Sequence, residues 1–80
     1  MNRQELGRIL EQEGVSKDAY SLMEDRTGDR YILLQQKPGT WAVYYSERGE
    51  QNDLEIFNTE HEACCELLRR LLSDPTTRKR

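Results

Sequence analysis

The residues of this chain whose types could do chemistry stand close together in its last third: one histidine, His61, and two cysteines, Cys64 and Cys65. A catalytic histidine needs a nucleophile or an acid within reach, and a structural zinc site needs four ligands. These residues supply at most three ligands, and neither a CxxC pair nor a second histidine completes the set. We interpret His61 as an exposed surface residue and Cys64 as a small buried hydrophobe, while the reactivity of Cys65 stays open.

Sequence signatures of cofactor and metal sites are missing from the rest of the chain. No GxGxxG or Walker-type phosphate loop occurs, and the acidic loop 50–53 lacks the alternating oxygen ligands of a calcium loop. No nucleophile–base pair of the kind that covalent catalysis requires can be identified. We therefore expect no catalytic residues, no cofactor and no metal, and the chain is not predicted to be an enzyme.

Acidic side chains are concentrated instead in the segment 47–66. Against a single base, Arg48, this segment holds seven acids: Glu47, Glu50, Asp53, Glu55, Glu60, Glu62 and Glu66. Apolar residues are threaded between them, so the segment must fold and must also show a concentrated negative surface. Such a surface attracts positively charged partners and speeds their encounter. The pattern predicts binding rather than chemistry, although Glu47 and Arg48 could instead form a local ion pair beside the turn residue Gly49.

Length and charge limit the function further. Eighty residues form one small domain with a thin core, which we assign to 1–75, followed by a flexible basic tail at 76–80. Without the last three residues the net charge of −3 becomes −6, so the folded body is acidic and nucleic-acid binding is disfavoured. No apolar run approaches the ~20 residues that span a bilayer. We expect no membrane contact, no signal peptide and a cytoplasmic location, with reduced cysteines.

Local patterns predict the element order α-β-β-β-β-α. A first helix is capped by Asn2 and stopped by Gly14, and a last helix follows the cap Thr59 and ends at Asp74. Four strands are expected between them, at 19–23, 30–36, 41–47 and 53–57. Because the loops are short, we predict an α+β fold with a four-stranded antiparallel meander sheet and with the N- and C-terminal helices packed on one face.

The two faces of this sheet have different predicted roles. In the third strand Trp41, Val43 and Tyr45 form the bulkier and more apolar set, so we expect them to face the helices. The far face then carries Tyr44 together with residues of the neighbouring strands: Ile32, Leu34 and Phe57. This face is either an exposed contact patch or is covered by a helix or the chain ends, and the sequence leaves both possibilities open.

Three segments of the second half of the chain, 39–49, 57–64 and 71–75, resemble the small bacterial immunity proteins that accompany polymorphic and contact-dependent toxins. The likeness lies in the strand–turn–helix pattern, from GTWAVYYSERG through FNTEHEAC to LLSDP. The resemblance implies a stoichiometric inhibitor without catalytic residues, which binds a cognate toxin domain in the cytoplasm. It implies no binding motif common to the family.

Charge and resemblance together predict an acidic immunity protein whose partner is a toxin domain with a basic surface, such as a nuclease. The residues predicted to contact this partner are an apolar anchor and a set of charged side chains: Tyr44, Glu47, Arg48, Glu50, Asp53, Glu55, Glu60 and Glu62. The alternative is a small homo-oligomeric structural or regulatory module, such as a homodimer, in which Ile32, Leu34 and Tyr44 form a self-complementary surface.

Overall fold

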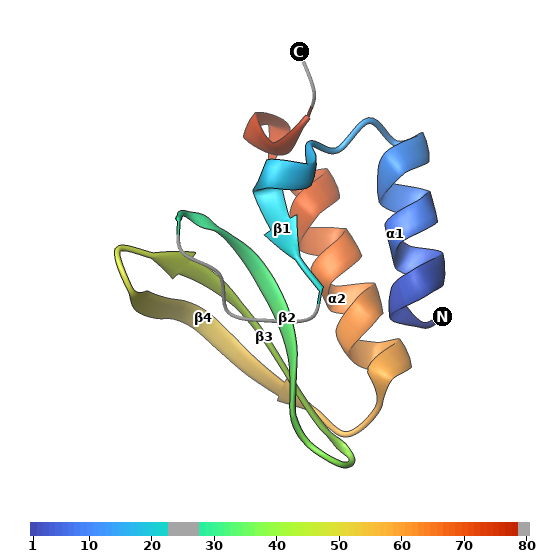
Figure 1. Cartoon of the computed structure of the whole chain (residues 1–80), viewed down its shortest axis with the longest axis vertical. Helices are drawn as coiled ribbons and strands as arrows, with labels where there is room; N and C mark the ends of the chain where they lie inside the picture. Colours follow the sequence, from blue (N-terminus) through green and yellow to red (C-terminus); the bar gives the residue numbers. More distant parts are fainter. Residues whose placement is uncertain (23–27, 79–80) are drawn as a thin grey trace.

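The computed structural model describes residues 1–22 and 28–78 of the chain. Figure 1 shows two α-helices side by side on one face of a sheet, which confirms the α+β class with a helix at each end. Two short 3-10 helices, η1 and η2, add to the predicted order. The elements are α1 (Arg3–Gln12), η1 (Lys17–Ala19), β1 (Tyr20–Ser21), β2 (Arg30–Lys37), β3 (Thr40–Glu47), β4 (Glu50–Phe57), α2 (Glu60–Ser73) and η2 (Pro75–Thr77).

Polar side chains start both α-helices as predicted. Asn2 accepts the backbone N–H of Glu5 through its Oδ1 at 2.9 Å. Thr59 accepts the backbone N–H of Glu62 at 3.1 Å, and its hydroxyl donates to Glu62 Oε1 at 3.0 Å. These bonds satisfy donors that the first turn of a helix leaves unpaired. The two bonds between Thr59 and Glu62 fix the point at which α2 begins after β4.

The four-stranded sheet is mixed rather than antiparallel throughout. Its order is β1-β2-β3-β4, and β1 pairs parallel to β2 while the other pairs are antiparallel. The predicted all-antiparallel meander is therefore wrong at β1. That prediction assumed that parallel strands need a long crossover. β1 pairs only Tyr20 with Tyr31 and Ser21 with Ile32. Two residues of strand are only about 7 Å long, so the connection from the end of β1 back to the start of the paired part of β2 has a short distance to cover. Most of the expected turn at 25–28 lies outside the described residues.

A two-residue turn joins β3 to β4. Arg48 and Gly49 have φ values of 52° and 82°, and a type I′ turn requires positive φ at both positions. β4 consequently starts at Glu50, earlier than predicted, and Glu50 lies directly opposite Glu47. Asp53, with a φ of 55°, marks a bulge where the register between β3 and β4 shifts.

The main core lies between the helices and the inner face of the sheet. Trp41 and Val43 pack there as predicted, together with Leu33 and residues of both helices: Leu6, Leu10, Ala63, Cys64, Leu67 and Leu71. Phe57 also packs against this core and pairs with Trp41 across β3 and β4. The predicted place of Phe57 on the far face is therefore wrong, because Phe57 lies opposite the inward-facing Trp41, while Ile56, opposite Ala42, points outward and is exposed.

The outer face of the sheet, away from the helices, carries a second and smaller core. Ile32 is fully buried and Tyr44 is 1% exposed, with half-buried Leu34 packed against them. The exposed contact patch considered for these residues is therefore not a surface of this structure. In the described part of the chain, the large apolar side chains that are exposed belong to β4, where Leu54 is 45% and Ile56 51% exposed.

The C-terminal segment is folded further than predicted. Thr77 is buried, its hydroxyl donates to Leu71 O at 2.8 Å, and its own carbonyl accepts the N–H of Ser16 at 2.7 Å. Val15 and Arg78 form an isolated β-bridge. Residues 76–78 therefore belong to the folded unit rather than to a flexible tail, while the last two residues of the expected tail lie outside the described residues.

Candidate functional site

The acids predicted to bind a partner lie at two opposite ends of the sheet. β4 runs from the hairpin end, where Glu50 pairs with Glu47, to the end at which the chain enters α2. Glu60 and Glu62 therefore lie a full strand length from Glu47 and Glu50, as Figure 1 shows. The single negative surface expected over 47–66 is thus divided into parts with different surroundings.

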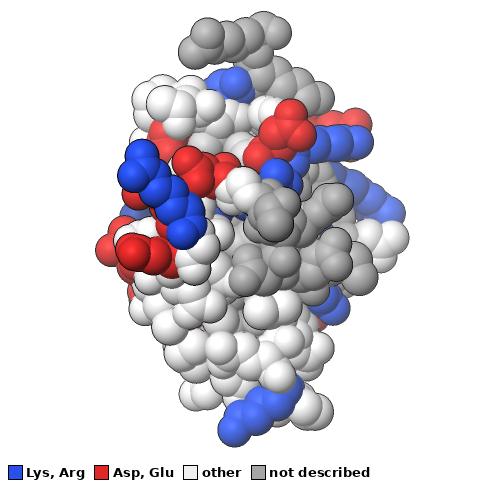
Figure 2. Space-filling view, turned by 60° about the vertical axis from the view of Figure 1, so that its left-hand side comes forward, with Lys and Arg blue, Asp and Glu red and all other residues white. Residues whose placement is uncertain are grey.

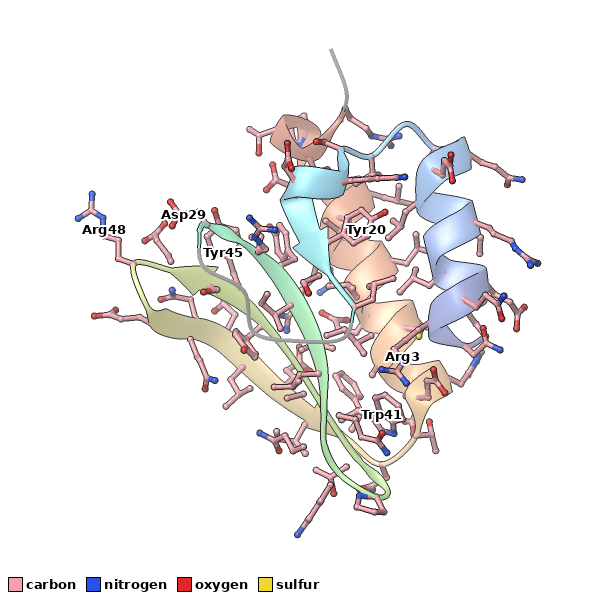
Figure 3. The ribbon with its side chains drawn as sticks, viewed as in Figure 1. Arg3, Tyr20, Asp29, Trp41, Tyr45 and Arg48 are labelled. Atoms are coloured by element: carbon pink, nitrogen blue, oxygen red, sulfur yellow. The ribbon has the colours of Figure 1, made fainter. Side chains whose placement is uncertain are left out.

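At the α2 end, the acids are bound by other parts of the fold. Glu60 Oε2 accepts the backbone N–H of Arg3 at 2.9 Å and its Nε–H at 3.2 Å. The guanidinium carbon of Arg3 lies 5.0 Å from the ring centroid of Trp41, and both side chains are labelled in Figure 3. Glu62 is used in the cap with Thr59. These contacts join α1, α2 and β3, and they leave Glu60 neutralised.

Glu55 and Glu66 are neutralised as well, by two arginines of α2. Arg70 donates to Glu66 Oε2 at 2.6 Å and to Glu55 Oε1 at 2.7 Å, and Arg69 donates twice to Glu66, at 2.9 and 2.6 Å. Hydrogen bonding by Arg69, opposed by burial and reinforced by Arg70, lowers the pKa of Glu66 to about 2. This network ties β4 to the second half of α2, and its charges largely cancel.

The hairpin end is different, because its acids have no cation within ion-pair distance among the described residues. Glu47, Glu50 and Asp53 are all exposed, as is Arg48 in the turn between them. The backbone N–H of Arg48 donates to Asp29 Oδ1 at 3.3 Å, but the local ion pair considered for Glu47 and Arg48 is not formed. We call Glu47, Arg48, Glu50 and Asp53 the hairpin cluster. In Figure 2 charged side chains gather toward one end of the face shown, and much of its other half is uncharged.

Sequence reasoning missed three further residues at the hairpin end: Asp29, Tyr31 and Asp74. The rings of Tyr31 and Tyr45 meet edge to face, with centroids 4.8 Å apart and an interplanar angle of 63°. The Tyr31 hydroxyl donates to Asp74 Oδ2 at 3.0 Å. Burial, and then the carboxylates of Asp29, Glu47 and Asp74, raise the pKa of Tyr45. Figure 3 shows Asp29, Tyr45 and Arg48 at the same end of the molecule.

The other predicted contact residues are placed less favourably. Tyr44 is 1% exposed on the outer face, so it is not an apolar anchor on the surface of this structure. Glu55, Glu60 and Glu62 carry the contacts described above. The structure therefore brings together only the hairpin cluster from the predicted set, and binding by any of these residues stays a prediction.

His61 and the two cysteines lie in the first half of α2, far from the hairpin cluster. His61 is exposed, with its Nδ1 2.7 Å from the amino group of Met1 and its Nε2 3.7 Å from Cys65 Sγ. Cys64 is buried, and burial raises the pKa of its thiol to about 11. Within residues 1–22 and 28–78, no group of three or more histidine, cysteine, aspartate or glutamate side chains could hold a metal ion.

Comparison with known proteins finds no relative: no protein-family model, no curated protein and no solved structure matches this chain. None of the helices that the described residues form has the length and apolar character needed to cross a bilayer.

Proposed function

We propose that this chain is a non-catalytic binding protein that presents the hairpin cluster to a basic protein partner. The observation that carries the proposal is the state of its acids: Glu47, Glu50 and Asp53 are exposed and have no ion pair among the described residues. Like charges that face each other across two strands are destabilising. The pairing of Glu47 with Glu50 is therefore better explained by a cationic partner than by the stability of the free protein.

We further propose that the partner is a toxin domain and that the chain neutralises it as an immunity protein. This step is supported by the resemblance of segments 39–49, 57–64 and 71–75 and by the acidity of the chain, whose pI is about 5.1. A toxin that cleaves nucleic acid needs a basic surface to hold phosphates, and an acidic protein competes for that surface. The two free thiols, Cys64 and Cys65, fit a reducing compartment, so the proposal places the protein in the cytoplasm.

Recovery of the partner tests the proposed activity directly. Affinity capture from the source cell and mass spectrometry should identify a basic protein, which is then assayed for its reaction with and without this chain. The expected result is complete loss of the partner's activity at one equivalent. A partner that lacks a basic surface, or one that stays fully active at excess inhibitor, would contradict the proposal.

Charge-neutralising variants test the role of the hairpin cluster. Glu47→Gln combined with Glu50→Gln should slow association with the partner about tenfold at low salt, because steering by exposed charges sets the encounter rate. The difference should shrink at high salt, where such charges are screened.

A matched control removes two charges at the other end of the molecule, through Glu5→Gln and Glu62→Gln. Gln retains the capping ability of Glu at the third position of a helix, so α2 should start unchanged. If the control pair slows association as much as the hairpin pair, net charge rather than the hairpin cluster governs the encounter.

A homodimer is the second candidate function, and one observation favours it. β4 is an edge strand with exposed Leu54 and Ile56, and an unpaired edge can pair with a second chain. The bulge at Asp53 and the acids of β4 oppose regular pairing. Sedimentation equilibrium separates the candidates: a dimer that Ile56→Thr converts to monomer supports this function, and a monomer at every concentration excludes it.

A further inference from the structure

A groove of about 740 Å³ lies at the hairpin end. It lies between the second half of α2 and the inner side of β2, β3 and β4. Tyr31 and Tyr45 supply its aromatic lining, and Asp53 and Leu54 of the bulged strand lie along its edge. A smaller hollow of about 210 Å³ shares Tyr31, Tyr45 and Asp74 with the groove. The two tyrosines are therefore lining residues of both hollows.

The cations that line this groove are already in ion pairs, although the buried Nη1 of Arg70 has no hydrogen-bond partner among the described residues. Arg69 and Arg70 form their ion pairs with Glu66 and Glu55, and the side chain of Arg70 is only 9% exposed. A phosphate or carboxylate ligand would have to compete with these acids for both guanidinium groups. The groove is therefore poorly suited to an anion.

Carboxylates on the groove remain able to take a cation. Asp53 lines the groove and has no ion pair among the described residues. Negative charge also acts at Tyr45, because its pKa is raised first by burial and then by the carboxylates of Asp29, Glu47 and Asp74, which come from three separate parts of the chain. A cationic ligand meets aromatic rings and negative charge at the same place.

We infer that this groove is the receptor for an arginine side chain of the partner protein. A guanidinium group stacks on aromatic rings and pairs with a carboxylate through two parallel N–H donors, which combines the two features found here in Tyr45 and Asp53. A lysine ammonium offers only a point charge and is more strongly hydrated. This inference rests on the proposed function, because it names the group by which a basic partner is held after its encounter with the hairpin cluster.

The test uses the whole chain without any partner, so that it can fail independently of the proposed function. Tyrosine ring resonances are followed by NMR as N-acetyl-arginine methylamide is added, with the lysine and citrulline analogues as controls. The expected result is saturable binding at millimolar concentration with shifts at Tyr31 and Tyr45, weaker binding of the lysine analogue and none of citrulline. Equal responses to arginine and citrulline, equal affinity for lysine and arginine, or no response at the tyrosines would overturn the inference.

Three variants at two positions locate the binding. Asp53→Asn should weaken arginine binding at least threefold, and it leaves the bulge intact because Asn tolerates a positive φ as well as Asp does. Tyr45→Phe keeps the ring and should bind nearly as well as the natural protein, whereas Tyr45→Leu should lose most of the binding. Unchanged binding in both Asp53→Asn and Tyr45→Leu would place the arginine elsewhere. An effect of the hairpin variants on association with the partner, measured separately, then tells whether the proposed function itself stands.

Discussion

The α2 end and the hairpin end of the molecule are both rich in acids, but the acids behave differently. At the α2 end, Glu60 is bound to Arg3 and Glu62 caps a helix, so both side chains stabilise the fold. At the hairpin end, Glu47 and Glu50 face each other and form no ion pair with a base among the described residues. The comparison shows that the number of acids in a segment does not measure its negative potential, because the bases that cancel it come from elsewhere in the chain.

The ion pairs that neutralise Glu66 should stabilise the fold. Arg70→Met should lower the free energy of unfolding by about 2–3 kcal/mol, because it leaves Glu66, 14% exposed, without one of its two cations in a poorly solvated place. Arg69→Gln is the control, since Arg69 binds the same carboxylate but is 65% exposed, and it should cost under about 1 kcal/mol. Chemical denaturation of both variants measures the difference. Equal losses would mean that burial does not distinguish the two arginines.

Acid should weaken the same network. The pKa of Glu66 falls from its usual 4.5 to about 2 in the folded protein, so the unfolded chain binds the proton more readily between these values. The contribution of Glu66 to stability is present above pH 5 and is lost as the pH falls toward 2. Denaturation midpoints measured over this range should decline in the natural protein and decline less in Glu66→Gln. Parallel profiles would contradict this origin of the pH dependence.

Half-buried Arg3 and exposed Arg48, at opposite ends of the molecule, offer a direct contrast. Arg3→Gln should destabilise the protein by about 1 kcal/mol, since it loses the bond to Glu60 and the contact with Trp41. Arg48→Gln should leave thermal stability unchanged, because the side chain of Arg48 makes no ion pair with the described residues. A loss at Arg48 as large as at Arg3 would remove the distinction between the two ends.

The smallest expected effect has the opposite sign. Glu50→Lys replaces a repulsion with an attraction to Glu47 across the hairpin and should raise the free energy of unfolding by about 0.5 kcal/mol. The same variant should slow association with a basic partner. Higher stability together with weaker binding would show that the charges of Glu47 and Glu50 serve binding of the partner rather than stability of the fold. A variant that is less stable than the natural protein would indicate an unrecognised structural role for Glu50.

The helices and the central strands could be predicted from the sequence because their signals are local. Asn2 and Thr59 mark helix starts by their own hydrogen bonds, and the alternation around Trp41 and Val43 identifies the inner face of β3. The direction of β1 could not be predicted, because two residues carry no periodicity and their pairing depends on where the chain returns. The bulge at Asp53 could not be predicted either. The assignment of Phe57 failed because the apolar Leu54 and Ile56, expected to face the core, are exposed.

The candidate site was predicted only in part, for a related reason. Glu47, Arg48 and Glu50 are neighbours in sequence and were found as a charged turn. Asp29 and Asp74 are distant in sequence from Tyr45, and each has an ordinary local explanation in a turn or at a helix end. Their convergence depends on tertiary packing, which a single sequence does not display. The arginines that cancel Glu55 and Glu66 could have been suspected from their spacing on α2.

The contact of Thr77 and Arg78 with Val15 and Ser16 affects the order in which the parts of the chain can fold during synthesis. Val15 and Ser16 are synthesised well before their partners Thr77 and Arg78. Until η2 has left the ribosome, the segment after α1 lacks the hydrogen bond to Thr77 and the β-bridge to Arg78 that hold it against the rest of the molecule. We therefore expect the protein to complete its folding only after synthesis of η2. The C-terminal end of α1 should be one of the last parts of the fold to become fixed in place.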